Sequence, residues 1–145
     1  MNADKSFDVT EFLPYLLNQA AEQTSLEFQR HYRERFGMLR SEWRVLFHLG
    51  KFGSLTSNDI VQLARIHKTK ISRAVHALEE KGFLRRDRDG QDRRRGYLQL
   101  TKMGLKVYDE LVGQAETYEM MLCEQLGHRE TALLKRALRV LAEQK

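Results

Sequence analysis

Hydrophobic residues recur at steps of three and four along most of the chain, which is the period of helices with one apolar face. The first such segment is expected to run from Pro14 to Phe36, because proline favours the first helical turn and Gly37 follows the last apolar position. A second segment begins after Ser41, whose side chain suits an N-cap, and ends at Gly50. It is apolar almost all round, so we expect it to be buried.

A third, shorter helix is predicted after the turn at Gly53. Thr56 has the side chain of an N-cap, and Asp59 is well placed for the positive end of the helix dipole. The inward positions are expected to be Ile60, Leu63 and Ala64.

The fourth predicted helix, from Lys68 to Lys81, has two faces of opposite character. Its apolar positions follow the i, i+3, i+4, i+7 rule and are Ile71, Ala74, Val75 and Leu78. At about 100° per residue, the opposite face holds Thr69, Arg73, His76 and Glu80, flanked by Ser72 and Ala77. One face is therefore expected in the core, and the other faces solvent or a partner.

The period changes from helical to alternating after Gly82. Residues 83–84 and 97–100 predict two strands, and the polar loop between them holds Gly90 and Gly96, so a hairpin is the economical interpretation.

Two more helices complete the pattern. Thr101 is expected to cap the fifth, which ends at Gly127, and the sixth runs from about Glu130 to Glu143. The apolar face of the fifth holds Leu105, Tyr108, Leu111, Val112, Ala115, Tyr118 and Leu122. That of the sixth holds Leu134, Ala137, Leu138 and Leu141.

Length and composition favour one helix-rich domain, since 145 residues with 41% hydrophobic content and one proline suffice for a single core. The net charge of +5 favours an acidic partner, with nucleic acid first. A single cysteine, Cys123, excludes an intramolecular disulfide and indicates a reducing compartment, the cytoplasm. No apolar stretch approaches the roughly 18 residues of a membrane span, and the polar start is unlike a signal peptide, so we expect no membrane partner.

Positive charge is concentrated in residues 85–96, where six arginines face three aspartates and account for +3 of the +5. A charged hairpin beside a small helix is suited to grip a phosphate backbone while the helix enters a groove. A solvated arginine-rich loop is the alternative.

Three short helices followed by a hairpin form a winged helix-turn-helix, and three motifs add a family resemblance. They are Asp92-Arg93-Arg94 followed by Leu100-Thr101-Lys102-Met103-Gly104, the segment Ser41-Glu42-Trp43-Arg44-Val45-Leu46, and Leu78-Glu79-Glu80-Lys81-Gly82-Phe83-Leu84. With these motifs the chain resembles the MarR family of bacterial transcription regulators. The resemblance implies a mainly α fold with a small β-hairpin wing and with dimerisation helices at both termini.

The fourth helix is the expected recognition helix. Thr69, Arg73 and His76 are placed to meet base edges, and Arg73 suits a bidentate contact to guanine. Phosphate contacts are expected from Lys68, Lys70 and Ser72. Two positions depart from the family pattern: His67 replaces a better capping residue, and Lys70 stands where a small hydroxyl is common.

The wing is expected to hold itself rigid and to present arginines to DNA. We expect Asp92 and Arg94 to pair across its tip, and the resemblance implies that Arg94 enters the minor groove. The alternative is that Arg94 pairs only with aspartates and does not contact DNA. The other wing arginines expected at DNA are Arg86, Arg88, Arg93 and Arg95.

The outer helices hold apolar residues that a small winged-helix core cannot cover, which indicates an interface. The resemblance implies a homodimer on a pseudo-palindromic site, with one MarR-type domain over residues 1–145, a winged-helix lobe at about 40–100, and dimerisation helices at about 10–36 and 101–145. A monomer whose terminal helices wrap their own core is the alternative.

The resemblance also implies a pocket for a small aromatic or phenolic effector between the two regions. The candidate lining residues are Phe28, His31, Tyr32, Trp43, Phe47 and Tyr108, with Arg44 as the anion partner. Aromatic residues at helical spacing more often form plain core, which is the alternative.

Other chemistry has little support in the sequence. Cys123 has no base beside it in the sequence, so packing is favoured over oxidation sensing. The five histidines are scattered, no metal site or cofactor is expected, and no catalytic group is visible. We therefore expect a ligand-responsive regulator, most often a repressor in this family; the alternative is a winged-helix module that binds RNA or a protein.

Overall fold

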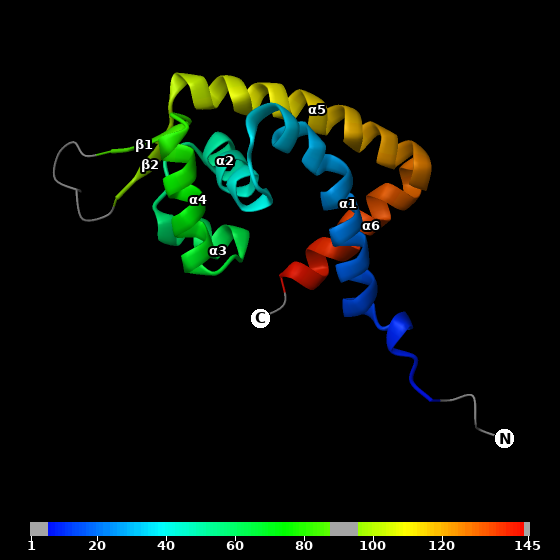
Figure 1. The fold of residues 1–145 in the computed structure, drawn as a ribbon. Helices are drawn as coiled ribbons and strands as arrows, with labels where there is room; N and C mark the ends of the chain where they lie inside the picture. The colour runs from blue at the N-terminus through cyan, green and yellow to red at the C-terminus, as the bar shows by residue number, and fades with distance from the viewer. Residues whose placement is uncertain (1–5, 88–95, 144–145) are drawn as a thin grey trace.

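The computed structural model describes residues 6–87 and 96–143, in which a two-stranded hairpin is set among helices (Figure 1). The elements are η2 (Val9–Glu11), α1 (Leu13–Phe36), α2 (Arg40–Phe52), α3 (Ser57–Ala64), α4 (Lys68–Glu80), β1 (Leu84–Arg86), β2 (Leu98–Leu100), α5 (Lys102–Leu126) and α6 (His128–Ala142). Helices α2, α3 and α4 lie beside the hairpin, α5 extends away from it, and α6 turns back past α1 (Figure 1). The expected mainly α winged-helix fold is confirmed.

Helix α2 differs from its prediction at both ends. Ser41 is not the N-cap: the helix begins at Arg40, and the cap residue Leu39 makes no side-chain hydrogen bond. The helix also continues through Gly50 to Phe52 and ends at Gly53, where φ is +89°. Gly50 is required for packing, because a Cβ there would overlap the ring of Tyr108 in α5.

Helices α3 and α4 place the helix-turn-helix on the core. The predicted N-cap Thr56 is confirmed: Thr56 and Asp59 form a reciprocal capping box at the start of α3. Leu63 was expected inside but is 46% exposed, because the buried stripe is centred on Ile60 and Ala64, and half-buried Val61 extends it on the other side. The four predicted inward residues of α4 are all buried.

The hairpin is short and continues into α5. Leu84 pairs with Leu100 and Arg86 with Leu98 in antiparallel register, and an isolated bridge from Leu55 to Leu98 extends this pairing. Both strands begin one residue later than predicted.

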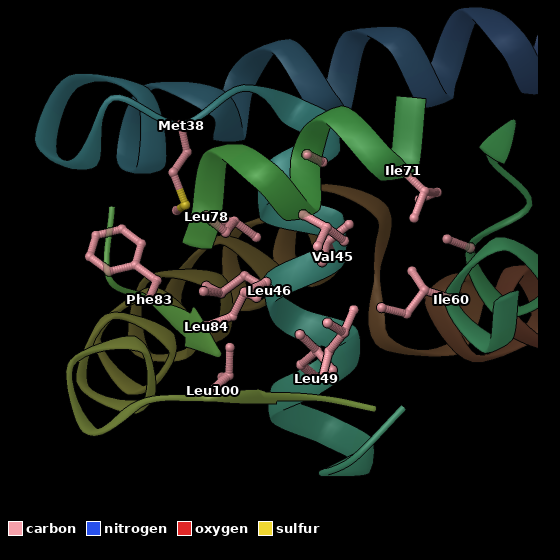
Figure 2. Close-up of a cluster of buried hydrophobic side chains, with 14 of the residues drawn as sticks. Met38, Val45, Leu46, Leu49, Ile60, Ile71, Leu78, Phe83, Leu84 and Leu100 are labelled. Carbon is pink, nitrogen blue, oxygen red and sulfur yellow. The ribbon is translucent and has the colours of Figure 1, made fainter. Parts of the chain in front are cut away.

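The core surrounds α2, with side chains from α4 and the hairpin closing over it (Figure 2). In α5 the buried face is Gly104, Val107 and Leu111, whereas the predicted face residue Leu105 is 46% exposed. The physical reason is Gly104, where an added Cβ would overlap the Phe83 carbonyl; this close approach fixes the rotation of α5.

Candidate nucleic-acid interface and aromatic cavity

The outer face of α4 is exposed because its inner face is held by the core. All six predicted DNA-binding residues of this helix lie in solvent: Lys68, Thr69, Lys70, Ser72, Arg73 and His76. His76 Nε2 is 3.6 Å from Glu80 Oε1, one turn along the same face. His67, which stands where the family pattern has a better capping residue, still caps the helix, since its Nδ1 accepts a 3.2 Å hydrogen bond from the Thr69 amide.

A groove continues this surface from α4 to β1. It is lined by Ser57, Lys68, Thr69, Ser72, Arg73, Val75 and Arg86. Arg86 therefore lies beside the recognition face as expected, but its Nε also pairs with Glu79 Oε1 at 3.3 Å. At the root of the hairpin, the Asp87 amide donates to Tyr97 O at 2.7 Å. The other predicted wing residues, Arg88, Asp92, Arg93, Arg94 and Arg95, lie outside the described residues.

A cavity of about 220 Å³ lies between α1 and α2. Its lining residues are Thr24, Ser25, Phe28, Tyr32, Arg40, Trp43, Arg44 and Phe47. Five of the seven predicted pocket residues are thus brought together. The ring of Trp43 stacks on Tyr32 with a centroid distance of 5.9 Å and an interplanar angle of 17°, so the wall is flat and aromatic. Phe28 and Tyr32 also belong to the buried core.

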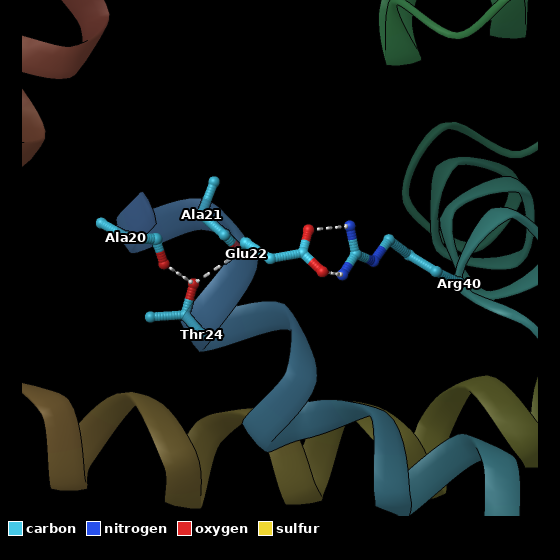
Figure 3. A network of polar contacts seen from close by, with 5 residues as sticks. All are labelled: Ala20, Ala21, Glu22, Thr24 and Arg40. Carbon is cyan, nitrogen blue, oxygen red and sulfur yellow. Dashed lines mark hydrogen bonds and ion pairs between the residues drawn. The ribbon is translucent and has the colours of Figure 1, made fainter. Parts of the chain in front are cut away.

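Two arginines give one side of this aromatic cavity a positive charge. Arg40 makes a bidentate pair with Glu22 at 3.1 and 3.2 Å (Figure 3). Arg44 Nη2 donates to Ala64 O at 2.6 Å and has no acidic partner within the described chain. Burial, followed by the charge of Arg40, lowers the pKa of the Arg44 guanidinium, which still leaves a cation at neutral pH. An anion placed here would relieve both effects.

Two predicted pocket residues lie elsewhere. His31 packs on the ring of Phe28 at 5.0 Å but does not line the cavity, and Tyr108 fills the space opposite Gly50. Sequence reasoning missed Thr24, Ser25 and Arg40. Helical spacing could have identified Thr24 and Ser25, since these positions lie one turn before Phe28 in the same helix. Figure 3 shows Thr24 donating back to the Ala20 carbonyl at 2.9 Å.

Cys123 corrects another expectation. Its Sγ lies 3.1 Å from Nδ1 of His128, which the turn at Gly127 brings beside it, so a base is adjacent after all. No group of three or more potential metal ligands occurs among residues 6–87 and 96–143. None of the described helices is both long and apolar enough to cross a membrane.

The sequence is similar to those of known transcription regulators. A family model described as "MarR family" matches residues 36–95. An uncharacterized HTH-type transcriptional regulator, YwoH of Bacillus subtilis (strain 168), is 31% identical over 103 residues, which cover 71% of this chain and 74% of that protein. The HTH-type transcriptional regulator FarR of Neisseria gonorrhoeae is 30% identical over 127 residues, covering 88% and 86% respectively.

Two solved structures extend the similarity beyond the matched segment. The MarR family transcriptional regulator SPO1453 from Silicibacter pomeroyi DSS-3 has a TM-score of 0.83 and 28% identity, covering 95% of this chain and 98% of that chain. NadR in complex with 4-hydroxyphenylacetate has a TM-score of 0.81 and 26% identity, covering 90% and 95%. The likeness therefore includes the long helices as well as the helix-turn-helix and hairpin.

Proposed function

The chain belongs to the MarR family of DNA-binding transcription regulators, which are not enzymes, and from this premise we propose that it is a homodimeric, ligand-responsive repressor of a pseudo-palindromic operator. The observation that supports DNA recognition best is the exposed outer face of α4, which is rich in cations and held by a fully buried inner face. A rigid helix of this kind, beside a wing, is what reads a major groove.

The residues of this surface divide into two roles. Arg73 and Thr69 lie where base edges would be met, and an arginine reads guanine by two hydrogen bonds. His76 belongs with them. Phosphate contacts are assigned to Lys68, Lys70 and Ser72. From the wing we add Arg86, Arg88, Arg93 and Arg95, with Arg94 in the minor groove, held by Asp92.

Fluorescence anisotropy with duplexes from the promoter regions beside its own gene tests this assignment. With six to ten phosphate contacts, affinity should fall by about three to five decades between 50 and 200 mM salt. Arg73→Ala should cost about 1–3 kcal/mol of binding free energy and relax base preference at one position per half-site. Lys51→Ala on the exposed side of α2 removes the same charge and should leave affinity unchanged. Equal effects of both substitutions, or equal affinity for single-stranded RNA, would contradict the proposal.

Dimerisation is supported by apolar surface that the monomer leaves open. No residue of α6 is buried in the described chain, and the exposed apolar residues of the two C-terminal helices include Met120, Met121, Leu126, Leu133, Leu134, Leu138, Val140 and Leu141. Helix α1 adds Leu13, Leu16 and Leu26. A second copy would cover these faces, as isologous packing in a two-fold dimer requires.

The effector is proposed to be a small aromatic acid bound in the aromatic cavity. Flat rings supply the apolar walls, and Arg44, which has no acidic partner among the described residues, supplies a cation for a carboxylate. The similarity to NadR, whose structure holds 4-hydroxyphenylacetate, points to the same ligand class. Such a ligand shifts DNA binding only through its different affinity for the two arrangements of the dimer, about 1–3 kcal/mol in useful effectors.

The single tryptophan makes the effector test direct, because Trp43 lines the cavity. Titration with 4-hydroxyphenylacetate should change its fluorescence, and Arg44→Gln should weaken this binding about tenfold by removing one charge-assisted contact. Arg30→Gln on the exposed side of α1 is the matched control. Operator DNA should lower the affinity for the ligand by the same factor by which the ligand lowers the affinity for DNA. A Trp43 response that Arg44→Gln leaves intact would contradict the pocket assignment.

A further inference from the structure

A second cavity, of about 530 Å³, lies where the start of α2 meets the turn of the helix-turn-helix. Its lining residues are Leu39, Arg40, Ser41, Arg44, Arg65, Ile66, His67 and Lys70. It shares only Arg40 and Arg44 with the aromatic cavity, so these two side chains stand between the two spaces.

The lining of this second cavity is strongly cationic. Four side chains, from Arg40, Arg44, Arg65 and Lys70, carry full positive charges, and no carboxylate is among the described lining residues. Of the four, only Arg40 has an acidic partner in the described chain, the bidentate Glu22. The other three cations lie around one space without an acidic partner among the described residues, which favours an anion in it.

Backbone contacts hold two of these cations in place. Arg44 donates to Ala64 O at 2.6 Å, and Arg65 Nη2 donates to Ala142 O at 2.8 Å. Each guanidinium has five N–H donors, so most remain available for a ligand. Ile66, which is buried, and Leu39 add an apolar part to the wall.

We propose that this cationic cavity is a second ligand site, which binds a small organic anion with two or more negative charges and a compact apolar body, such as an aryl phosphate. The volume is within the range of small-molecule pockets and exceeds what a lone oxyanion fills. The apolar part of the wall favours such a ligand over a backbone phosphate of DNA, because the backbone phosphate has no apolar group to place against it.

Occupation of the site has a consequence for DNA binding, and this part rests on the proposed function. Lys70 lies in the first turn of α4, and His67 caps that helix, so both belong to the cavity and to the recognition surface. An anion that engages Lys70 withdraws it from a DNA phosphate. The ligand and duplex DNA therefore compete, with equal and reciprocal weakening.

Isothermal titration calorimetry of the full chain with phenyl phosphate, in the absence of DNA, tests the site. Arg65→Asn removes a cation that the aromatic cavity lacks, and asparagine tolerates the left-handed backbone of this position, where φ is +56°. It should weaken binding about tenfold, whereas Arg65→Lys keeps the charge and should weaken it less. Arg129→Gln on exposed α6 lowers the net charge equally and should leave the affinity unchanged.

The outcomes separate the site from the proposed function because the first titration contains no DNA. Absence of binding at millimolar phenyl phosphate, or equal effects of Arg65→Asn and Arg129→Gln, would overturn the site. Inorganic phosphate that binds as tightly as phenyl phosphate would overturn the organic ligand in favour of a simple phosphate contact. If phenyl phosphate binds at this site but leaves duplex affinity unchanged, the competition is overturned while the site stands.

Discussion

At the scale of single residues, two glycines of α5 have opposite surroundings. A Cβ at Gly104 would overlap the Phe83 carbonyl oxygen and lie 2.8 Å from its carbon, and that carbonyl is fixed by a 3.0 Å hydrogen bond from the Thr101 amide. Nothing lies within 4 Å of a Cβ at Gly113. The space available for a methyl group therefore decides whether a glycine-to-alanine substitution raises or lowers the free energy of unfolding.

We expect Gly104→Ala to lower the free energy of unfolding by about 3 kcal/mol, the upper part of the range for overpacking, because backbone must move. Gly113→Ala should raise it by about 0.5–1 kcal/mol, since alanine is the better helix former. Urea denaturation of both variants checks this. Similar changes in the two would show that Gly104 does not set the approach of α5 to the hairpin.

Residue-level predictions from sequence succeeded where the cause is local. The Thr56 and Thr101 caps depend on side chains that bond to amides three positions on, and both form as expected. The errors involve short-range contacts that depend on how the backbone turns. The sequence around Cys123 does not show that a turn returns His128 to its sulfur, and no local rule makes His67 a cap.

At the scale of elements, a hydrogen bond from Tyr118 joins α5 to α1. Its hydroxyl donates to Glu27 Oε1 at 2.5 Å, while Arg35 pairs with Glu110 further along the same two helices. Burial and then the bond to Glu27 raise the pKa of Tyr118 to about 12. The bond from Tyr118, followed by that from Gln23, lowers the pKa of Glu27.

The signs of these shifts define a pH dependence. The folded pKa of Tyr118 exceeds its usual value near 10, so its stabilising contribution is complete below about pH 10 and is lost as pH rises toward 12. Absorbance titration at alkaline pH should show a tyrosine that ionises near 12, and Tyr118→Phe should remove that step. Tyr15→Phe, on α1, should leave it in place. A titration unchanged by Tyr118→Phe would contradict the link between α5 and α1.

Periodicity predicted every long element because an apolar stripe must be buried to stabilise a helix. It misplaced the end of α2, since a glycine inside a helix and a glycine after one look alike in sequence. Gly50 serves the packing of Tyr108, and Gly53, at φ +89°, ends the helix. Only the partner helix distinguishes the two roles.

At the scale of the whole molecule, Leu138 and Leu63 offer a matched pair of exposed leucines. They are 39% and 46% exposed, on α6 and α3 respectively. Leu138→Glu should dissociate the proposed dimer, because an ionised group would enter a dry helix interface. DNA affinity should then fall, since one half-site loses the effective concentration provided by the other. Sedimentation of both variants checks this, and a dimer that survives Leu138→Glu, or fails with Leu63→Glu, would contradict the assigned interface.

The candidate sites were predictable in part. Residues of the outer face of α4 follow from helix geometry alone, and five residues of the aromatic cavity follow from the family resemblance. The cationic cavity was not predicted, because its members come from α2, the turn and α4, and only folding brings Arg40 and Arg44 of α2 beside Arg65 and Lys70. A cluster of charged side chains that come from several elements produces no periodic pattern in the sequence.

The double role of Thr101 gives the long helix α5 a pivot. Its hydroxyl donates to Gly82 O at 2.6 Å and accepts from the Gly104 amide at 3.0 Å, so one side chain connects the end of α4, the hairpin and the start of α5. A helix of 25 residues is about 38 Å long at 1.5 Å per residue. A tilt of about 5° at Thr101 would displace the far end of such a helix by about 3 Å. We therefore expect movements of a few ångström among the distal helices to rotate α4 and the hairpin by only a few degrees.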